Sequence, residues 1–415
     1  MNSIQLSFRN ILRHRNRSVV TIMTVCLGFT ALGVIGGILG NIFSRLKGQA
    51  IVAEKMGHIT FAKQGFFDNG KLEPEKYLWS KQELAGIMQI LKADPEVALA
   101  TPRLRMFGIA SNSKSSTIFI TEAIVPEDDQ QLLKTPIDGR TEKGMMSLAP
   151  QKGTHPKVAI SEELSHMLGI KKGQNITMLT TTKDGMANAV DADVENVYNT
   201  GNPATNDKFI LSDYTLAQNL YDTDGAERVV ATLKHPEKLA GVKAALTSKL
   251  NQAGYKIEAR GWDEQSPSYK KVTTMFGVIF RVLTIIITVI VLLTLLNTMQ
   301  VTVNERTKEI GTMRAIGMLK RGVIKIFCIE GLMMGIFGCI IALPILFLVS
   351  GILQASHASF VPPVASTSIP LVLKLEPQKI IPVFVLFCVA SLLSSFIVSR
   401  RISNQKVVNS LMQFN

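Results

Sequence analysis

The sequence predicts a polytopic α-helical membrane protein: four transmembrane helices, with a large mixed α+β extracytoplasmic domain inserted between helices 1 and 2. Of its 415 residues, 47% are hydrophobic and only 19% are charged, whereas soluble domains carry roughly 25% charged residues. The apolar residues fall into four long stretches, and one long polar segment lies between the first stretch and the second. This apolar composition excludes an intrinsically disordered chain, and four cysteines are too few for a disulfide scaffold.

Four stretches are long enough to cross a membrane, which takes about 20 mostly apolar residues. The first, 18–43, has no charged residue and is too long for a cleaved signal peptide, so we expect it to be retained. The second span is predicted over 272–303 and is uncharged from residue 282 onward. The third, 326–353, contains only Glu330, and the fourth, 380–399, is uncharged.

The formal net charge of +13 is unevenly distributed. The predicted outer domain, 44–271, holds 29 basic and 28 acidic residues, so nearly all the excess flanks the spans. This distribution argues against nucleic-acid binding, which needs a basic stripe on the soluble part. The positive-inside rule instead places the cytoplasmic segments at 1–17, 304–325 and 400–415. The outer domain and a short loop at 354–379 then lie on the opposite side.

The outer domain is predicted to be mixed α and β, with two lobes. Ser80 and Glu83 form a capping box that opens a helix ending near Lys92. Alternating residues at 103–111 and 117–125 indicate a hairpin, and 180–206, rich in Thr, Asn, Asp and Gly, is expected to be a long loop. We expect the other strands at 57–63, 174–180, 227–233 and 255–260, and the other helices at 161–169 and 236–253. Two β–α–β units joined across a loop would fit this order.

Catalytic chemistry is not indicated anywhere in the chain. None of the six His has a partner at metal-ligand spacing, and Asp191, Asp193 and Glu195 are more typical of a solvated loop than of a cation site. There is no nucleophile elbow and no G-x-x-x-x-G-K-[ST] phosphate loop. We therefore predict no catalytic residue, no metal and no cofactor in this chain, which on this basis is not an enzyme.

Two charged residues lie within or beside the predicted spans. An intramembrane carboxylate such as Glu330 marks function by default. Its position five residues past Lys325 suggests that it snorkels or pairs with Lys325 or the preceding loop. Arg281 is at the outer edge of the second span, where we expect it to snorkel.

The first span is rich in glycine and includes the small-residue motif Gly36-x-x-x-Gly40. Two interpretations are open. The commoner is close packing within the chain. The alternative is a seam between two subunits, formed by Gly33, Gly36, Gly37 and Gly40, where an apolar substrate would enter.

The cytoplasmic loop reads NERTKEIGTMRAIGMLKRG over 304–322 and is helix-prone. Ile310, Met313 and Ile316 or Gly317 lie on one face at helical spacing. Periodicity alone fits both an ordinary charged loop and a helix that docks into a partner's groove.

The segment ERTKEIGTMRAIGM closely resembles the signature of the permeases related to MacB, FtsX and the lipoprotein-release permeases. The order of one span, a large outer domain and three spans resembles that family over nearly the whole chain. VAISEELSHMLGIKKGQNITML, GHITF and RGWDEQSPSY look most like the lipoprotein-release (LolC/LolE-like) branch, whereas EAIVPEDD departs from the family pattern.

The resemblance implies an ABC transporter permease of the bacterial inner membrane with a MacB-like outer core. Such permeases form homodimers or heterodimers and work with two copies of an ATPase chain that binds ATP and Mg. The residues that match the coupling helix, which would seat on the ATPase, are Glu305, Arg306, Glu309, Gly311, Arg314 and Gly317, with Ile310 on its apolar face.

The implied function is extraction of lipoproteins from membrane lipid toward a periplasmic carrier. The alternatives are tripartite efflux of drugs, peptides or siderophores through an adaptor protein, and FtsX-like regulation of cell-wall hydrolases without transport. Residues 44–56 and 266–281 could extend the first two spans outward as stiff helices that transmit motion.

Overall fold

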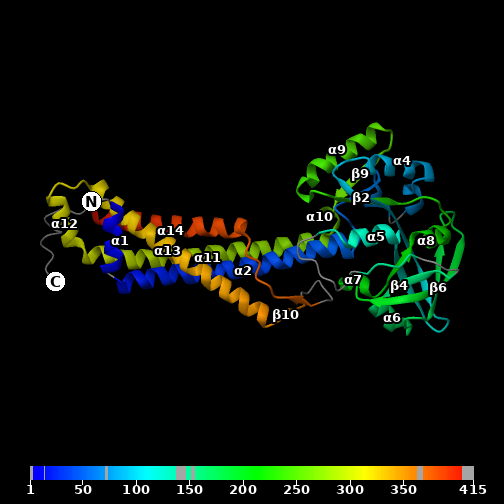
Figure 1. Ribbon diagram of the computed structural model, residues 1–415, viewed down its shortest axis with the longest axis horizontal. Helices are drawn as coiled ribbons and strands as arrows, with labels where there is room; N and C mark the ends of the chain where they lie inside the picture. The colour runs from blue at the N-terminus through cyan, green and yellow to red at the C-terminus, as the bar shows by residue number, and fades with distance from the viewer. Residues whose placement is uncertain are drawn as a thin grey trace. The chain divides into compact units, whose positions relative to one another are not determined.

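The computed structural model describes residues 3–13, 15–70, 73–136, 146–150, 155–361 and 368–403. The chain divides into two compact units. The helical unit comprises Met1–Asn41, Thr274–Ala358 and Pro370–Asn415. The insert domain comprises Ile42–Thr273 and Ser359–Ile369. Figure 1 shows the long helices of the first and the sheets of the second.

The helical unit contains four helices that are long and apolar enough to cross a membrane. They are α2 (Arg15–Gly48), α11 (Pro267–Glu305), α13 (Lys320–Ala355) and α14 (Pro377–Ser403). Two shorter helices accompany them, α1 (Ser3–Arg13) and α12 (Thr307–Ala315). Phe29, Leu32, Leu346 and Phe387 form a buried core between the long helices. Other apolar side chains, including Ile285 and Leu293, point away from the protein, as in helices whose outer surface meets lipid.

The first lobe of the insert domain is a four-stranded antiparallel sheet in the order β2-β8-β1-β9. Its strands are β1 (Ile59–Lys63), β2 (Val97–Ser111), β8 (Arg228–Leu233) and β9 (Ile257–Gly261). Helix α4 (Lys81–Lys92) connects toward β2, and α9 (Leu239–Gln252) connects β8 to β9, so the lobe contains two β–α–β units. Phe61, Ile87, Leu91 and Leu246 fill the core.

The second lobe is a six-stranded sheet that closes on itself, because β2 pairs with both β3 and β5 at the two ends of the order β3-β7-β4-β6-β5. Its other strands are β3 (Ser116–Ile124), β4 (Lys157–Ser161), β5 (Asn175–Thr181), β6 (Ala187–Tyr198) and β7 (Phe209–Asp213). The longer helices are α5 (Pro126–Leu133), α6 (Glu162–Leu168) and α8 (Tyr214–Tyr221). The short helices of the insert domain are α3 (Phe66–Asn69), α7 (Pro203–Asn206) and α10 (Trp262–Gln265).

Strand β2 belongs to both lobes. Its residues 97–103 pair with β8 of the first lobe, and residues 104–111 pair with β3 of the second. The two lobes are therefore halves of one continuous hydrogen-bonded structure.

Most predicted elements of the insert domain are present. The capping box at α4 is complete: the Ser80 side chain accepts from the Glu83 N–H, and the Glu83 carboxylate accepts from the Ser80 N–H at 2.8 Å. The predicted loop at 180–206 is wrong, because residues 187–198 form β6. Val190, Ala192 and Val194 alternate with polar residues, and antiparallel pairing with β5 places Ala192 and Val194 in the core.

Candidate functional site: the coupling segment and its ion pairs

The helix expected in the loop 304–322 is present as α12, between the end of α11 at Glu305 and the start of α13 at Lys320. We call residues 305–319 the coupling segment. It ends in a Schellman turn: the Met318 N–H donates to the Met313 carbonyl at 3.0 Å, and the Gly317 N–H to the Arg314 carbonyl at 3.1 Å. Gly317 has φ +102°, which an L-residue with a side chain rarely adopts. A glycine is therefore required where the chain reverses.

The turn after α12 exposes a cluster of apolar side chains. Ile316 is 82% exposed, Leu319 77% and Met318 37%. We call these three residues the coupling tip. Exposed aliphatic side chains grouped at a turn are typical of a surface that a partner covers.

The predicted apolar face of α12 points the other way. Ile310 is buried with Val303, Val323 and Phe327, and Met313 packs against the same cluster. Of the predicted face, the last position, Ile316 or Gly317, is at the surface. Periodicity identified an apolar side, but the chain's own helices α11 and α13 cover it.

Arg306 and Glu330 form a buried ion pair. The Arg306 guanidinium is 3.1 Å from the Glu330 carboxylate and 3.0 Å from that of Glu309. It also stacks over Phe327, 5.1 Å from the ring centroid. Glu330 therefore pairs with the loop, one of its expected partners, and not with Lys325. Arg306 is buried in the chain, where it ties α12 to α13. Its predicted role in contacting the ATPase stays a prediction.

Glu305 and Glu309 of the coupling segment also form ion pairs with arginines near the N-terminus. Arg17 donates two hydrogen bonds to the Glu305 carboxylate, and Arg13 lies 3.7 Å from Glu309. These pairs join residues nearly 300 positions apart in sequence. No local pattern in the sequence could have predicted them.

The other predicted coupling residues differ in exposure. Gly311 in α12 is buried, Arg314 is half-buried, and Gly317 is exposed.

The predicted seam glycines pack inside the helical unit. A Cβ at Gly33 would lie 2.8 Å from Leu346, at Gly37 2.5 Å from Leu373, and at Gly40 2.7 Å from the Lys379 Nζ. Gly36 faces Phe280 at 3.4 Å. The chain's own side chains approach all four positions, in agreement with the packing alternative. The subunit seam stays a prediction. Arg281 is exposed and donates to the Gly277 carbonyl at 3.3 Å.

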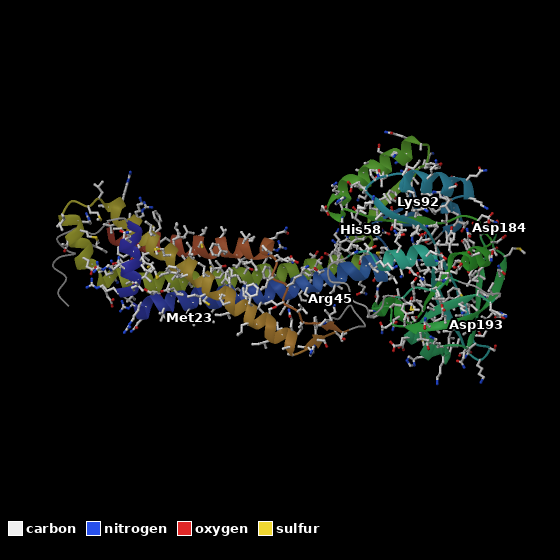
Figure 2. The ribbon with its side chains drawn as sticks, in the orientation of Figure 1. Met23, Arg45, His58, Lys92, Asp184 and Asp193 are labelled. Atoms are coloured by element: carbon white, nitrogen blue, oxygen red, sulfur yellow. The ribbon has the colours of Figure 1, made fainter. Side chains whose placement is uncertain are left out.

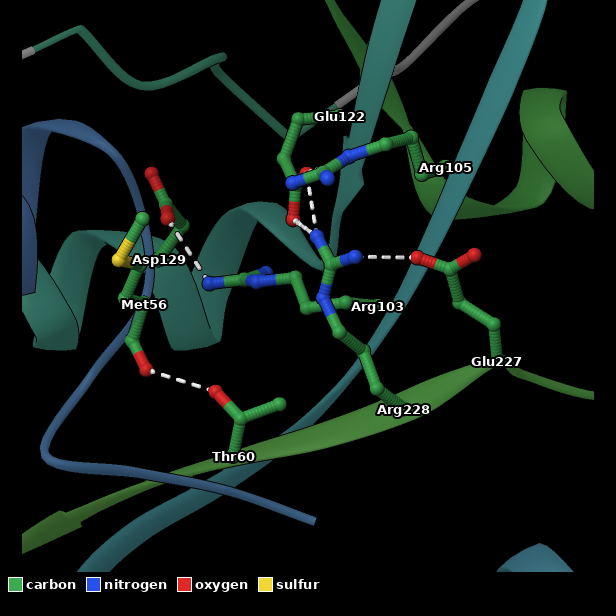
Figure 3. Close-up of polar contacts among 8 residues, drawn as sticks. All are labelled: Met56, Thr60, Arg103, Arg105, Glu122, Asp129, Glu227 and Arg228. Carbon is green, nitrogen blue, oxygen red and sulfur yellow. Dashed lines mark hydrogen bonds and ion pairs between the residues drawn. The ribbon is translucent and has the colours of Figure 1, made fainter. Parts of the chain in front are cut away.

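The insert domain contains a buried charge network that sequence analysis missed, and Figure 3 draws its Arg103–Asp129 pair. Lys55 Nζ lies 2.8 Å from the Asp129 carboxylate and 2.7 Å from the Met146 carbonyl. The guanidinium of Arg103 donates to the other Asp129 oxygen at 3.1 Å. All three charged side chains are at most 2% exposed. Lys55 also has φ +59°, so the segment that follows α2 is fixed by charge in a strained backbone conformation.

A second set of charges adjoins this network. The Arg228 guanidinium donates to Glu122 at 2.5 Å and also to Glu227, while Arg105 lies 3.2 Å from Glu122. Burial works to raise the pKa of Glu122, but the guanidiniums of Arg228 and Arg105 bring it below its ordinary value. Burial raises the pKa of Glu227 in spite of Arg228. The ions hold β2, β3 and β8 together where the lobes meet.

Other predicted acidic and metal features have no site geometry. Asp191, Asp193 and Glu195 lie on β6 and not in a loop, and Asp191 accepts a hydrogen bond from Thr177 at 2.6 Å. Within the described ranges no group of three or more His, Cys, Asp or Glu could hold a metal ion. A cavity of about 540 Å³ is lined by α5 and α8 residues, among them Glu127, Tyr214 and Asn219, but contains no nucleophile–base pair.

Comparison with known proteins gives one family match. Residues 281–407 match the family described as FtsX-like permease C-terminal. This part of the chain includes α12, the coupling tip and α13 in full. This C-terminal part of the chain is therefore similar to the C-terminal domain of FtsX-like permeases. No curated protein matches the chain.

Two solved structures resemble part of the chain. The periplasmic region of MacB from Actinobacillus actinomycetemcomitans is 10% identical with a TM-score of 0.36; the match covers 53% of this chain and 94% of that one. The extracellular domain of the ABC-type transporter YknZ from Gram-positive bacteria is also 10% identical, with a TM-score of 0.33, over 49% of this chain and 99% of that one.

Proposed function

We propose that this chain is the transmembrane permease subunit of an ABC transporter, driven by an ATPase on a separate chain. The observation that carries the proposal is the exposed coupling tip within the FtsX-like permease domain. Ile316, Met318 and Leu319 form the apolar contact, and Glu309 and Thr312 lie on the exposed side of α12 beside them. ATP and Mg²⁺ would bind on the ATPase.

The transmission path begins beneath the tip. Force on α12 would reach α13 through the Arg306–Glu330 pair and α11 through the continuous backbone. Helices α2 and α11 extend past the ends of their apolar segments, to Gly48 and from Pro267 respectively. Lys55 then fixes the end of the segment that follows α2 within the insert domain. We propose that ATP binding favours one arrangement of a permease dimer and moves the insert domain through these helices.

The proposed location is the bacterial inner membrane, with both termini in the cytoplasm and the insert domain outside. The arginines in α1 and the first turn of α2, those in the last turn of α14, and the nearly neutral charge of the insert domain support this orientation. Within this class, the branch resemblance of the sequence favours lipoproteins or another membrane amphiphile as the substrate.

The test is purification of the intact complex from native membranes, followed by mass spectrometry of every bound protein. Ile316→Asp is expected to abolish recovery of the ATPase, because it places a charge in the apolar contact. Ile118→Asp is the matched control, since Ile118 is 64% exposed but lies on β3 of the insert domain. If no ATPase accompanies the unmodified chain, or if both variants retain it equally, the coupling assignment is wrong.

The same preparation separates the substrate classes. Acylated proteins that ATP releases would support lipoprotein extraction. An adaptor protein without acylated cargo would replace it with tripartite efflux, and a cell-wall hydrolase would replace it with regulation.

A further inference from the structure

The N-terminal helix α1 is held against the helical unit by one face. The Ser7 hydroxyl donates to the Ile326 carbonyl at 3.1 Å, and the Phe8 ring meets the Phe337 ring edge-on with centroids 6.4 Å apart. Ile11 is 6% exposed in the cluster that also contains Phe327. In Figure 1, α1 runs across the direction of the long helices.

The surface that α1 leaves exposed combines apolar and cationic side chains. Phe8 is 46% exposed and Leu12 62%, and Arg9 and Arg13 are exposed beside them at helical spacing. Two large apolar residues therefore face outward beside arginines on one short helix. A helix that lies in the plane of a membrane interface has this composition, with its apolar residues among acyl chains and its cations at the headgroups.

The charge around this face is of one sign. The chain has no Asp or Glu before Glu54, while Arg9, Arg13, Arg15 and Arg17 fall within nine residues. Arg13 pairs with Glu309 at 3.7 Å, but its side chain is 73% exposed, so water-screened attraction holds it only weakly. The complement to this face is a negatively charged surface with an apolar interior.

We propose that the exposed face of α1 is a binding site for anionic phospholipids. Arg9 and Arg13 contact the headgroup phosphates, and Phe8 and Leu12 insert among the acyl chains. The proposal rests on the membrane location proposed above, but not on the ATPase or the substrate. Because Arg13 also reaches Glu309, bound lipid would lie directly beside the coupling segment.

The test compares lipids retained by the full chain, purified in detergent with equal amounts of phosphatidylglycerol and phosphatidylethanolamine and measured by native mass spectrometry. The unmodified chain is expected to retain phosphatidylglycerol preferentially. The double variant Arg9→Gln/Arg13→Gln should lower phosphatidylglycerol affinity about 30-fold, the change expected when two surface cations are lost. Arg9→Lys/Arg13→Lys keeps both charges and should keep the preference.

The matched control is Arg400→Gln/Arg401→Gln, which removes two exposed arginines from the last turn of α14. Its loss of phosphatidylglycerol affinity should be smaller than that of the α1 Gln variant, since a lipid site on α1 depends more on Arg9 and Arg13 than on cations elsewhere on the surface. Equal losses in the two Gln variants, or no headgroup preference in the unmodified chain, would overturn the proposal.

Recovery of the ATPase distinguishes this result from failure of the proposed function. If the α1 Gln variant keeps its lipid preference but loses the ATPase, α1 binds a protein partner and the lipid proposal is overturned. If it loses the preference and keeps the ATPase, the lipid proposal is supported on its own.

Discussion

His58 is a buried histidine that the structure holds neutral. Its Nδ1 accepts a hydrogen bond from the Leu233 N–H at 2.9 Å, and only 1% of the residue is exposed (labelled in Figure 2). Burial, with a smaller contribution from the Lys47 charge, lowers the pKa of His58 from 6.5 to about 4. In the unfolded chain, His58 therefore becomes protonated as the pH falls below about 6.5. In the folded domain, the same side chain stays neutral until about pH 4.

This residue makes the insert domain less stable in mild acid. As pH falls from about 6.5 to 4, His58 should remove up to about 3 kcal/mol of the free energy of unfolding. Both tryptophans, Trp79 and Trp262, belong to the insert domain, so urea unfolding followed by tryptophan fluorescence measures it within the full chain. His58→Asn, whose amide can still accept the bond, should flatten this pH dependence.

His166→Asn is the control for that measurement, because His166 is exposed on α6. It should keep the slope of the unmodified chain. If His58→Asn loses stability between pH 6.5 and 4 as steeply as the unmodified chain, His58 does not control the acid response.

At the scale of the helix, Gly37 of α2 and Gly277 of α11 differ in the space beside them. A Cβ at Gly37 would meet the Leu373 side chain at 2.5 Å and the Lys374 carbonyl oxygen at 3.2 Å. A Cβ at Gly277 would meet nothing within 4 Å. Gly37→Ala should therefore lower stability by about 1–3 kcal/mol through overpacking. Gly277→Ala should raise it by up to about 1 kcal/mol, since Ala has the higher helix propensity.

Thermal unfolding of the two variants in the same detergent checks this pair. Opposite shifts of the midpoint are expected. Destabilisation by Gly277→Ala as large as that by Gly37→Ala would mean that another surface covers α11.

The elements that sequence could predict are those whose signal is local. The capping box of α4, the β2–β3 hairpin and the apolar spans depend on neighbouring residues, and these are present. Strand β6 was missed because its Asp and Asn residues resemble a loop until β5 is beside it. The direction of the α12 apolar face and the partner of Lys55 depend on contacts from distant segments, which spacing does not encode.

At the scale of the whole molecule, the orientation proposed above can be tested with introduced cysteines. The four native cysteines lie within the helices α2, α13 and α14. A membrane-impermeant maleimide should label Lys114→Cys in intact cells, because residue 114 lies in the exposed turn between β2 and β3. It should label Ile316→Cys only after permeabilisation.

The unmodified chain gives the background for this labelling. Labelling of Ile316→Cys in intact cells, with Lys114→Cys protected, would reverse the orientation and with it the proposed position of the ATPase.

Strand β2 also limits how this architecture can be altered. A cut between its two halves would break the strand that joins the two lobes, because β8 and β3 bond to successive parts of one strand. Insertion of a single residue near position 103 would turn the side chains of one half from the core to the surface. One strand thus sets which side chains point inward in both lobes. We therefore expect that neither lobe can be grafted, exchanged or expressed as an independent module at this boundary.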